Sequence, residues 1–210
     1  MSPRRYSTEK RRADAEQTRA RVIEATRELV AAPDGMAGFS MEAVARQAGV
    51  ARMTVYYQFG SKVGLLEGVY DDLAQRSLVA SLRPVFETPD ALRAIDELVA
   101  AFGRFWASDR LLMRRLRALA VLDPDFEGAR ARDERRRDLF RNMVGRVAEQ
   151  YAQPEAAAAP RLVDVLTSLA SFESFDALAG ESGSLEDVIP AVQTLVRLAL
   201  STEGVESSEA

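Results

Sequence analysis

The chain has 210 residues, of which 28 are basic and 32 acidic, and it contains neither histidine nor cysteine. Without imidazole or thiolate groups it cannot form a Ser/His/Asp or Cys/His nucleophile pair or an ordinary structural zinc site. We therefore expect a protein that is not an enzyme and that needs no cofactor. A carboxylate-only or Mg²⁺-dependent mechanism requires neither residue type and is the alternative that the composition leaves open.

The apolar runs are all far shorter than the roughly 20 residues that a membrane span requires. The polar N-terminus also lacks the apolar segment of a signal peptide, and the absence of cysteine fits a reducing compartment. These features predict a cytoplasmic protein with no membrane partner.

Charge is distributed unevenly along the chain. Residues 1–62 carry 11 Lys/Arg against 7 Asp/Glu, whereas residues 63–210 carry 17 against 25. A basic head on an acidic body is expected when only the front of a protein meets a polyanion such as nucleic acid. Charge alone is equally consistent with chance or with solubility, so the pattern of the helices has to decide.

Four helices are predicted after a polar arm over residues 1–14. Apolar positions at helical spacing, such as Val22 and Val30, predict a first helix that ends at the breaker cluster of residues 32–35. Good N-caps and breakers delimit the next three, and Pro84 is expected to stop the fourth. These three helices cover residues 40–48, 51–58 and 62–82.

Five further helices are predicted beyond Pro84. Thr88-Pro89-Asp90 combines an N-cap, a proline at the first helical position and an acid, and Pro190 means that the last helix either starts late or is kinked. With no strand-like alternation anywhere, we predict an all-α fold of about nine helices. The five ranges are residues 89–107, 108–121, 123–151, 161–179 and 185–202, with an Ala/Pro-rich connector at 153–160.

Residues 39–58 contain the most informative pattern. Two short helices separated by a glycine-containing turn, the second one polar over an apolar base, form the layout of a helix-turn-helix motif. The second helix of such a motif can enter the major groove of DNA. The same layout occurs in proteins that never bind DNA. A helix-turn-helix that serves as a protein–protein interaction surface is therefore the alternative interpretation.

An extended pattern around this motif resembles a known family. The similarity to the N-terminal domain of the tetracycline-repressor (TetR) family of bacterial transcription regulators covers about residues 18–67. The matching residues are Met41-x-x-Val44-Ala45-x-x-Ala48, Gly49-Val50, Thr54-Val55-Tyr56-Tyr57-x-Phe59 and Ser61-Lys62-x-x-Leu65-Leu66. The resemblance implies a homodimer that binds a palindromic operator in double-stranded DNA, usually as a repressor. It also implies release when a small-molecule effector enters the C-terminal domain.

The resemblance and the predicted helices together suggest four parts. The first is a flexible basic arm over residues 1–14, and the second is a three-helix helix-turn-helix DNA-binding domain with a linking fourth helix over 15–75. A C-terminal helical bundle for effector binding and dimerisation follows over 76–204, and 205–210 is expected to be a disordered tail.

The third predicted helix and its flanks supply the candidate DNA contacts. Val55 and Phe59 are expected to face inward, which leaves the other side chains for the groove and the phosphates. Arg52 suits a bidentate pair with guanine, and Met53 suits a thymine methyl group. The candidates are Ser40, Arg52, Met53, Thr54, Tyr56, Tyr57, Gln58 and Lys62.

Three of these residues have two possible roles. At Lys62 a cation opposes the dipole of the fourth helix, but an ammonium and the adjacent helix N-terminus can together hold a phosphate oxygen. Ser40 can be a plain N-cap or can bond a phosphate. The resemblance implies that Tyr56 binds a phosphate, and we expect its ring to pack against the first helix at the same time.

Two residues depart from the family pattern. Ala51 stands where the family usually has Ser or Thr, so the third helix lacks an N-cap worth about 1 kcal/mol. Met53 replaces a residue that is usually small, and we infer an altered operator preference.

The N-terminal arm has two possible roles: it either follows the DNA groove and backbone or is a solvated tail. Its basic residues are Arg4, Arg5, Lys10, Arg11 and Arg12.

The C-terminal region contains a set of large, adaptable apolar side chains. They are either ordinary core or part of a pocket for a largely apolar effector. Arginines within 110–117 and 130–137 could attract an anionic ligand, although most are expected to be solvated or paired with acids. The pocket candidates are Phe102, Phe105, Trp106, Met113, Leu116, Phe126, Phe140 and Met143.

The last two predicted helices carry apolar stripes wide enough for two surfaces. One surface would face the core of the subunit and the other a symmetry mate, in an isologous four-helix interface. Burial within one chain is the alternative. The interface candidates are Leu162, Val165, Leu166, Leu169, Phe172, Val188, Val192, Leu195 and Val196.

Overall fold

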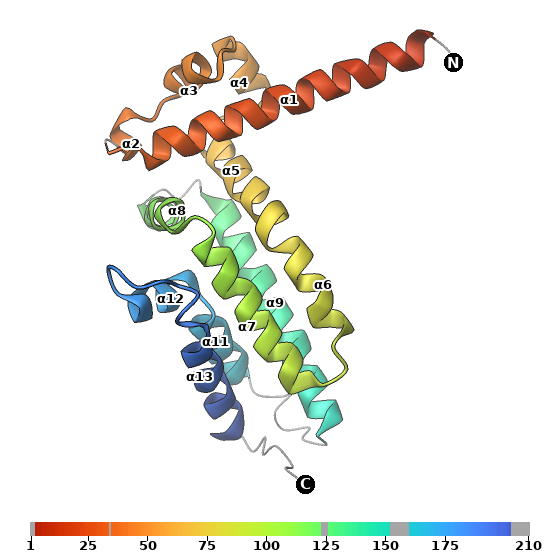
Figure 1. Cartoon of the computed structure of the whole chain (residues 1–210), viewed down its shortest axis with the longest axis vertical. Helices are drawn as coiled ribbons and strands as arrows, with labels where there is room; N and C mark the ends of the chain where they lie inside the picture. The colour runs from red at the N-terminus through yellow and green to blue at the C-terminus, as the bar shows by residue number, and fades with distance from the viewer. Residues whose placement is uncertain (1–2, 34, 123–125, 152–159, 203–210) are drawn as a thin grey trace. The chain divides into compact units, whose positions relative to one another are not determined.

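The computed structural model describes residues 3–33, 35–122, 126–151 and 160–202, and within these ranges it is all-helical (Figure 1). They contain twelve helices, against about nine predicted. Two predicted helices are each divided in two, and a short helix, α2 (Gly35–Gly38), lies at the predicted breaker cluster. None of the described helices is long and apolar enough to cross a membrane.

The chain divides into two compact units. Unit 1 comprises Met1–Leu73 and Arg114–Phe126, and unit 2 comprises Ala74–Met113 and Glu127–Ala210. The first boundary lies close to residue 75, where the sequence suggested a domain limit. The membership of Arg114–Phe126 in unit 1 has no counterpart in the sequence-based division.

Unit 1 is built on the long helix α1 (Pro3–Ala31). Helix α3 (Met41–Ala48) packs on α1, and α4 (Arg52–Phe59) packs on α3 (Figure 1). Together with the first part of α5 (Lys62–Ser77), these helices bury one apolar core, and the inward orientation predicted for Val55 and Phe59 is confirmed. The core side chains include Val22, Ile23, Val30, Met41, Val44, Val55, Phe59, Leu65, Leu66 and Val69.

Helix α1 begins at Pro3 and not after residue 14 as predicted. The added residues are polar on all sides and therefore show no apolar periodicity. They are nevertheless rich in good helix formers, and adding residues to an existing helix costs little. Arg12 Nε and Glu16 Oε1, 3.0 Å apart, form a weak surface pair in this part of the helix. In Figure 1 it extends beyond α3 and α4.

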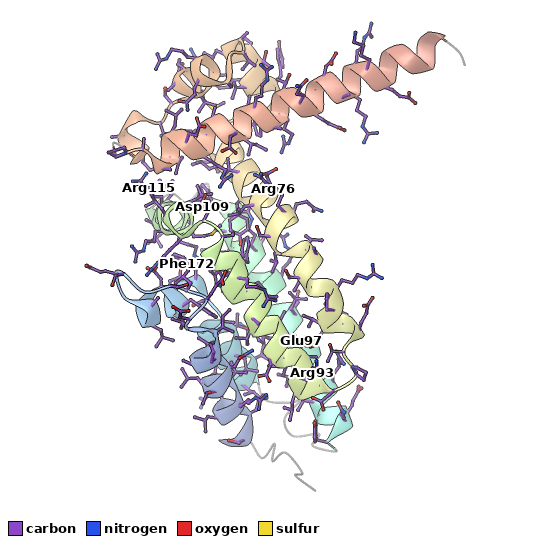
Figure 2. The ribbon with its side chains drawn as sticks, in the orientation of Figure 1. Arg76, Arg93, Glu97, Asp109, Arg115 and Phe172 are labelled. Atoms are coloured by element: carbon purple, nitrogen blue, oxygen red, sulfur yellow. The ribbon has the colours of Figure 1, made fainter. Side chains whose placement is uncertain are left out.

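Arg115 of α8 (Arg110–Leu122), labelled in Figure 2, joins the second half of that helix to unit 1. Its Nη1 donates to the carbonyl oxygen of Ala32 at 2.9 Å, just beyond the C-terminus of α1, where a cation also complements the helix dipole. The buried Gly35 leaves room for the guanidinium, because a Cβ there would lie 3.1 Å from Arg115 Cζ.

The helix predicted over residues 62–82 is in fact two helices, α5 and α6 (Val79–Glu87), and Pro84 does not stop it. Pro84 lies inside α6 and cannot donate to the carbonyl of Ala80. Both residues are exposed, so water can bond that carbonyl and the helix continues. The break falls instead at Leu78, between the two helices.

Unit 2 is completed by α7 (Ala91–Ala107), α9 (Glu127–Gln150), α11 (Pro160–Leu169), α12 (Phe172–Ala179) and α13 (Ile189–Thr202). Helix α7 is at the centre: α6, α9, α12 and α13 all pack on it (Figure 1). Helix α11 packs on α9 and α13. As a result, α7 buries side chains on nearly every side.

The cap of α7 is Asp90, whereas the sequence suggested Thr88. Asp90 Oδ1 accepts a hydrogen bond from the backbone N of Arg93 at 2.7 Å, which lowers the pKa of Asp90 below its ordinary value. Tyr151 donates its hydroxyl proton to Asp90 Oδ2 at 3.0 Å, and the pKa of Tyr151 is raised mainly by burial. The Thr88 hydroxyl bonds the carbonyl oxygen of Pro84 at 3.0 Å and is not used as a cap.

Two other predicted helix ends differ from those of the structure, and at a third the structure has one of the two predicted alternatives. Ser171 divides the helix predicted over 161–179, because its Oγ accepts from the backbone N of Ser174 at 3.2 Å and caps α12. Asp109, and not Ser108, bonds the first turn of α8. The last helix starts late, with Pro190 in its first turn. Residues 123–125, where a helix was predicted to start, most of the connector at 153–159 and the tail at 205–210 lie outside the described residues.

Glycine at position 103 lets α12 and α13 approach α7 closely. A Cβ on Gly103 would lie 2.6 Å from Ile189 Cγ1 and 2.7 Å from Phe175 Cε1. Both distances are shorter than any van der Waals contact. By contrast, a Cβ on Gly145 of α9 would meet nothing within 4 Å.

We expect Gly103→Ala to lower the free energy of unfolding by roughly 1–3 kcal/mol, because the added methyl overfills a packed core. The matched control, Gly145→Ala, should raise it by up to about 1 kcal/mol, because alanine has the higher helix propensity and meets no neighbour. Urea unfolding followed by circular dichroism measures both changes. Effects of the same sign and size would contradict the close packing at Gly103.

Candidate nucleic-acid interface

The segment from α3 to α4 has helix-turn-helix geometry. Ser40 Oγ accepts a hydrogen bond from the backbone N of Ala43 at 3.1 Å, so Ser40 is an N-cap whose hydroxyl proton can still be donated. Gly49 ends α3 in the left-handed conformation, with φ 66° and ψ 39°, which glycine adopts without steric cost. Ala51 provides no side-chain cap for α4, as expected from the sequence.

Helix α4 is buried on one side only. Val55 and Phe59 are 0% and 8% exposed and anchor the helix, as predicted. Met53 and Tyr57 are 56% and 84% exposed. Side chains this exposed contribute little to the burial that stabilises the fold, so they are available to a partner.

Arg52 is held by two neighbours on the solvent side of the motif. Its Nε lies 2.8 Å from Glu42 Oε1, and its Nη2 donates to the hydroxyl oxygen of Tyr56 at 3.1 Å. Its Cζ is also 5.1 Å from the centroid of the Tyr56 ring. The hydrogen bond with Tyr56, followed by the charge of Glu42, raises the pKa of Arg52 above its ordinary value. Two of the predicted contacts, Arg52 and Tyr56, therefore bond each other directly, and a carboxylate pairs with one of them.

Glu42 was not among the residues predicted from the sequence to contact DNA. The residue lies in the first turn of α3, while Arg52 is the first residue of α4. Helical periodicity relates residues within one helix and contains no information about a pair across a turn. The sequence did contain one signal for this pair. Glu42 is an acidic residue inside the helix-turn-helix motif at residues 39–58, within the net basic segment of residues 1–62.

Thr54, Tyr56 and Gln58 are half-buried, at the flanks of the exposed face of α4. Gln58 Oε1 is a buried atom with no hydrogen-bond partner in the described part of the chain. This oxygen is therefore not on the surface, and Gln58 is less available for a base contact than Met53 or Tyr57.

Lys62 is the first residue of α5 and lies just beyond α4. It is exposed, and its Nζ is 4.8 Å from the centroid of the Phe39 ring. Ser61 Oγ accepts from the backbone N of Gly64 at 3.0 Å, and a Cβ on Gly64 would lie 2.2 Å from the carbonyl oxygen of Phe59. The turn between the two helices is therefore tightly defined, and an ammonium is placed at a helix N-terminus.

The predicted pocket residues are all buried, and none is more than 6% exposed. They do not belong to one unit. Leu116 and Phe126 are part of unit 1, and the other six are part of unit 2. Burial of this kind is shared by core and closed pocket, so a role in effector binding stays a prediction.

Most of the predicted interface residues fill the core of their own unit. Only Val165 and Leu195 are exposed, at 45% and 39%, and Leu169 is half-buried. Leu198, which was not among the candidates, is 55% exposed on α13. The buried candidates are Leu162, Leu166, Phe172, Val188, Val192 and Val196.

Comparison with known proteins extends the resemblance. Residues 22–69 match a family model described as bacterial regulatory proteins, tetR family. No curated protein matches the chain. A solved transcriptional regulator from Rhodococcus sp. Rha1 is 20% identical, covering 88% of this chain and 96% of its own, with a TM-score of 0.65.

Two further structures cover almost the whole of both chains. A TetR transcription regulator from Haloarcula marismortui is 18% identical over 89% of this chain and 97% of its own, with a TM-score of 0.67. NalD, the secondary repressor of the MexAB-OprM multidrug efflux pump in Pseudomonas aeruginosa, is 18% identical over the same shares, 89% and 97%, with a TM-score of 0.59.

At these identities the solved structures establish the shared all-helical fold, while the matched segment contains the helix-turn-helix described above. Residues 22–69 are thus similar to the helix-turn-helix segment of the tetR family of bacterial regulatory proteins, and the chain as a whole shares the fold of the solved regulators.

Proposed function

We propose that the chain is a homodimeric transcriptional repressor that binds a palindromic operator and leaves it when a small molecule binds its C-terminal domain. The observation that carries this proposal is the exposed face of α4, where Arg52, Met53 and Tyr57 point to solvent beside Lys62. A helix of this kind, anchored on one side and polar on the other, is suited to a major groove.

The proposed contacts divide into positioning and reading. The Lys62 ammonium with the N-terminus of α5, the Tyr56 hydroxyl and the Ser40 hydroxyl would bind phosphates and fix the register. Arg52 would exchange Glu42 for guanine O6 and N7, and Met53 would contact a thymine methyl group. Thr54, Tyr57 and Gln58 flank this surface and would add phosphate or base-edge contacts.

Two arguments support a dimer, and a third supports repression. One recognition helix reads too little DNA for specificity, whereas two can read half-sites about 34–36 Å apart. The exposed Val165, Leu195 and Leu198 on α11 and α13 offer an apolar face for a second copy. NalD, which shares the fold, is a repressor. A small molecule that favours one arrangement of the dimer would shift the population away from the DNA-bound form.

We expect Lys62→Ala to weaken binding to operator and to random DNA by the same factor, because a phosphate contact carries no sequence information. The plot of log affinity against log salt should become shallower by about one unit per subunit. Mobility-shift titrations with the DNA upstream of the protein's own gene, at several salt concentrations, measure both quantities.

Arg104→Ala is the matched control for Lys62→Ala, since it removes the same charge from an exposed position in unit 2 and should change neither quantity. A wild-type protein that prefers no promoter fragment over random DNA would refute the proposal and favour protein–protein interaction by the helix-turn-helix.

Glu42→Gln should raise DNA affinity by about two- to fivefold, because Arg52 no longer has to leave an exposed ion pair and a negative charge near the phosphates is removed. Glu24→Gln on α1 changes the net charge equally and serves as the control. The same titrations provide the measurement. A loss of affinity would instead mean that Glu42 orients Arg52 for the groove.

The double variant Val165→Asp/Leu195→Asp should be monomeric, because two like charges on each copy would face their counterparts in an apolar contact. Size-exclusion chromatography with light scattering measures the mass, and circular dichroism checks that the helices remain. Val121→Asp changes an apolar side chain that is 85% exposed in unit 1 and should leave the dimer intact. A double variant that stays dimeric would place the interface elsewhere.

A further inference from the structure

A cluster of aromatic side chains in unit 2 surrounds the single tryptophan of the chain. The Trp106 ring centroid lies 4.7 Å from that of Phe105, 5.9 Å from that of Phe172 (labelled in Figure 2) and 6.0 Å from that of Phe102. Phe102 stacks in turn on Phe140, at 6.3 Å. These residues come from α7, α9 and α12, so the cluster joins three helices of the unit.

The guanidinium of Arg136 is buried against this cluster. Its side chain is 8% exposed, and its Cζ lies 5.8 Å from the centroid of the Trp106 ring. Nη1 donates to Asp133 Oδ1 at 3.0 Å, one turn earlier on α9. Nε has no hydrogen-bond partner among the residues that the structure describes. A buried cation is thus only partly satisfied.

This arrangement is unfavourable for the fold alone. A buried charge is costly unless it is paired and fully hydrogen-bonded. The Asp133 side chain is 37% exposed, so water weakens its attraction for Arg136. Trp106 adds a cation–π contact but no acceptor for the Nε proton. An apolar side chain at position 136 would pack against the same rings without a buried, unpaired donor.

We propose that Arg136 and the aromatic cluster recognise an organic anion, namely an effector with a carboxylate attached to an aromatic ring. The carboxylate accepts hydrogen bonds from Nε and a terminal nitrogen of Arg136 in a bidentate pair, and the ring packs beside Trp106. The inference rests on the proposed function, since it names the chemical class of the effector.

Admission of such a ligand requires movement of side chains on one face of α9. Arg136, Phe140 and Met143 recur there at helical spacing, and all are buried. Met143 is unbranched and adapts its shape more readily than a β-branched residue. The carboxylate compensates a cation that is already desolvated, so the acid gains an interaction that a neutral analogue of the same shape lacks.

Trp106 reports on this site directly, because no other tryptophan contributes to the emission of the protein. The full-length protein is titrated with two pairs of probes, benzoate with benzamide and cinnamate with cinnamamide. We expect the acids to change Trp106 fluorescence with an apparent affinity at least about tenfold higher than that of the amides. The acids should also raise the Tm.

Two variants test the role of Arg136. Arg136→Met should abolish the preference for the acid, and Arg136→Lys, which keeps the charge without the planar fork, should weaken acid binding about tenfold. Arg141→Met is the control, because Arg141 lies on the same helix but is exposed and paired with Asp138. If circular dichroism shows that Arg136→Met does not fold, the acid–amide comparison and the lysine variant decide.

Equal affinity for acid and amide, or no response of Trp106 to any of the four probes at millimolar concentration, would overturn the inference. Mobility shifts on the same samples separate this result from the proposed function. If the wild-type protein binds its operator but shows no preference for acids, only the proposed anion site is refuted. If it prefers acids but binds no promoter, the anion site is supported and the proposed function is refuted.

Discussion

The candidate DNA-binding surface depends on how little of α4 is buried. Of its eight residues, only Val55 and Phe59 are buried in the core, so the helix is positioned by these anchors and by the turns at its two ends. Gly49 fixes the turn that leads into α4, and the close approach of Gly64 to the Phe59 carbonyl fixes the turn that follows it. Gly68 completes the anchor, because a Cβ there would lie 2.8 Å from Phe59 Cε1. Every other side chain of α4 is thereby left at or near the surface without loosening the helix.

The cations of this surface have partners in the free protein. Arg52 bonds Glu42 and Tyr56, and the Lys62 ammonium lies against the Phe39 ring. These contacts are exposed and therefore weak, since water screens each of them. An exposed partner can be exchanged for a phosphate or a base at low cost, whereas a buried partner could not. The contacts restrain the side chains on the exposed side of the motif, which would reduce the entropy lost when a partner binds there.

The sequence predicted those features of the site that depend only on residues close together in the chain. The anchors Val55 and Phe59, the cap at Ser40 and the missing cap at Ala51 all follow from spacing and cap chemistry within a few residues. The bonds from Arg115 to Ala32 and from Tyr151 to Asp90 instead join residues that lie 83 and 61 positions apart in the chain. Periodicity cannot show such contacts. For the same reason it assigned six residues to a dimer surface that lie in the core of the subunit, because one apolar stripe looks alike in both places.

The incomplete hydrogen bonding of Arg136 is not shared by every buried charge in unit 2, as Asp96 shows. Asp96 is 9% exposed, and both of its carboxylate oxygens accept hydrogen bonds from Arg197 Nε, each at 3.1 Å. The backbone carbonyl of Asp96 accepts a further bond from Gln193 Nε2 at 3.0 Å, so two residues of α13 satisfy this buried site on α7. The fold therefore supplies complete pairing where a buried charge joins two helices. At Arg136 the described residues supply one half-exposed carboxylate and an aromatic ring but no acceptor for the Nε proton, and the proposed carboxylate effector would supply that acceptor.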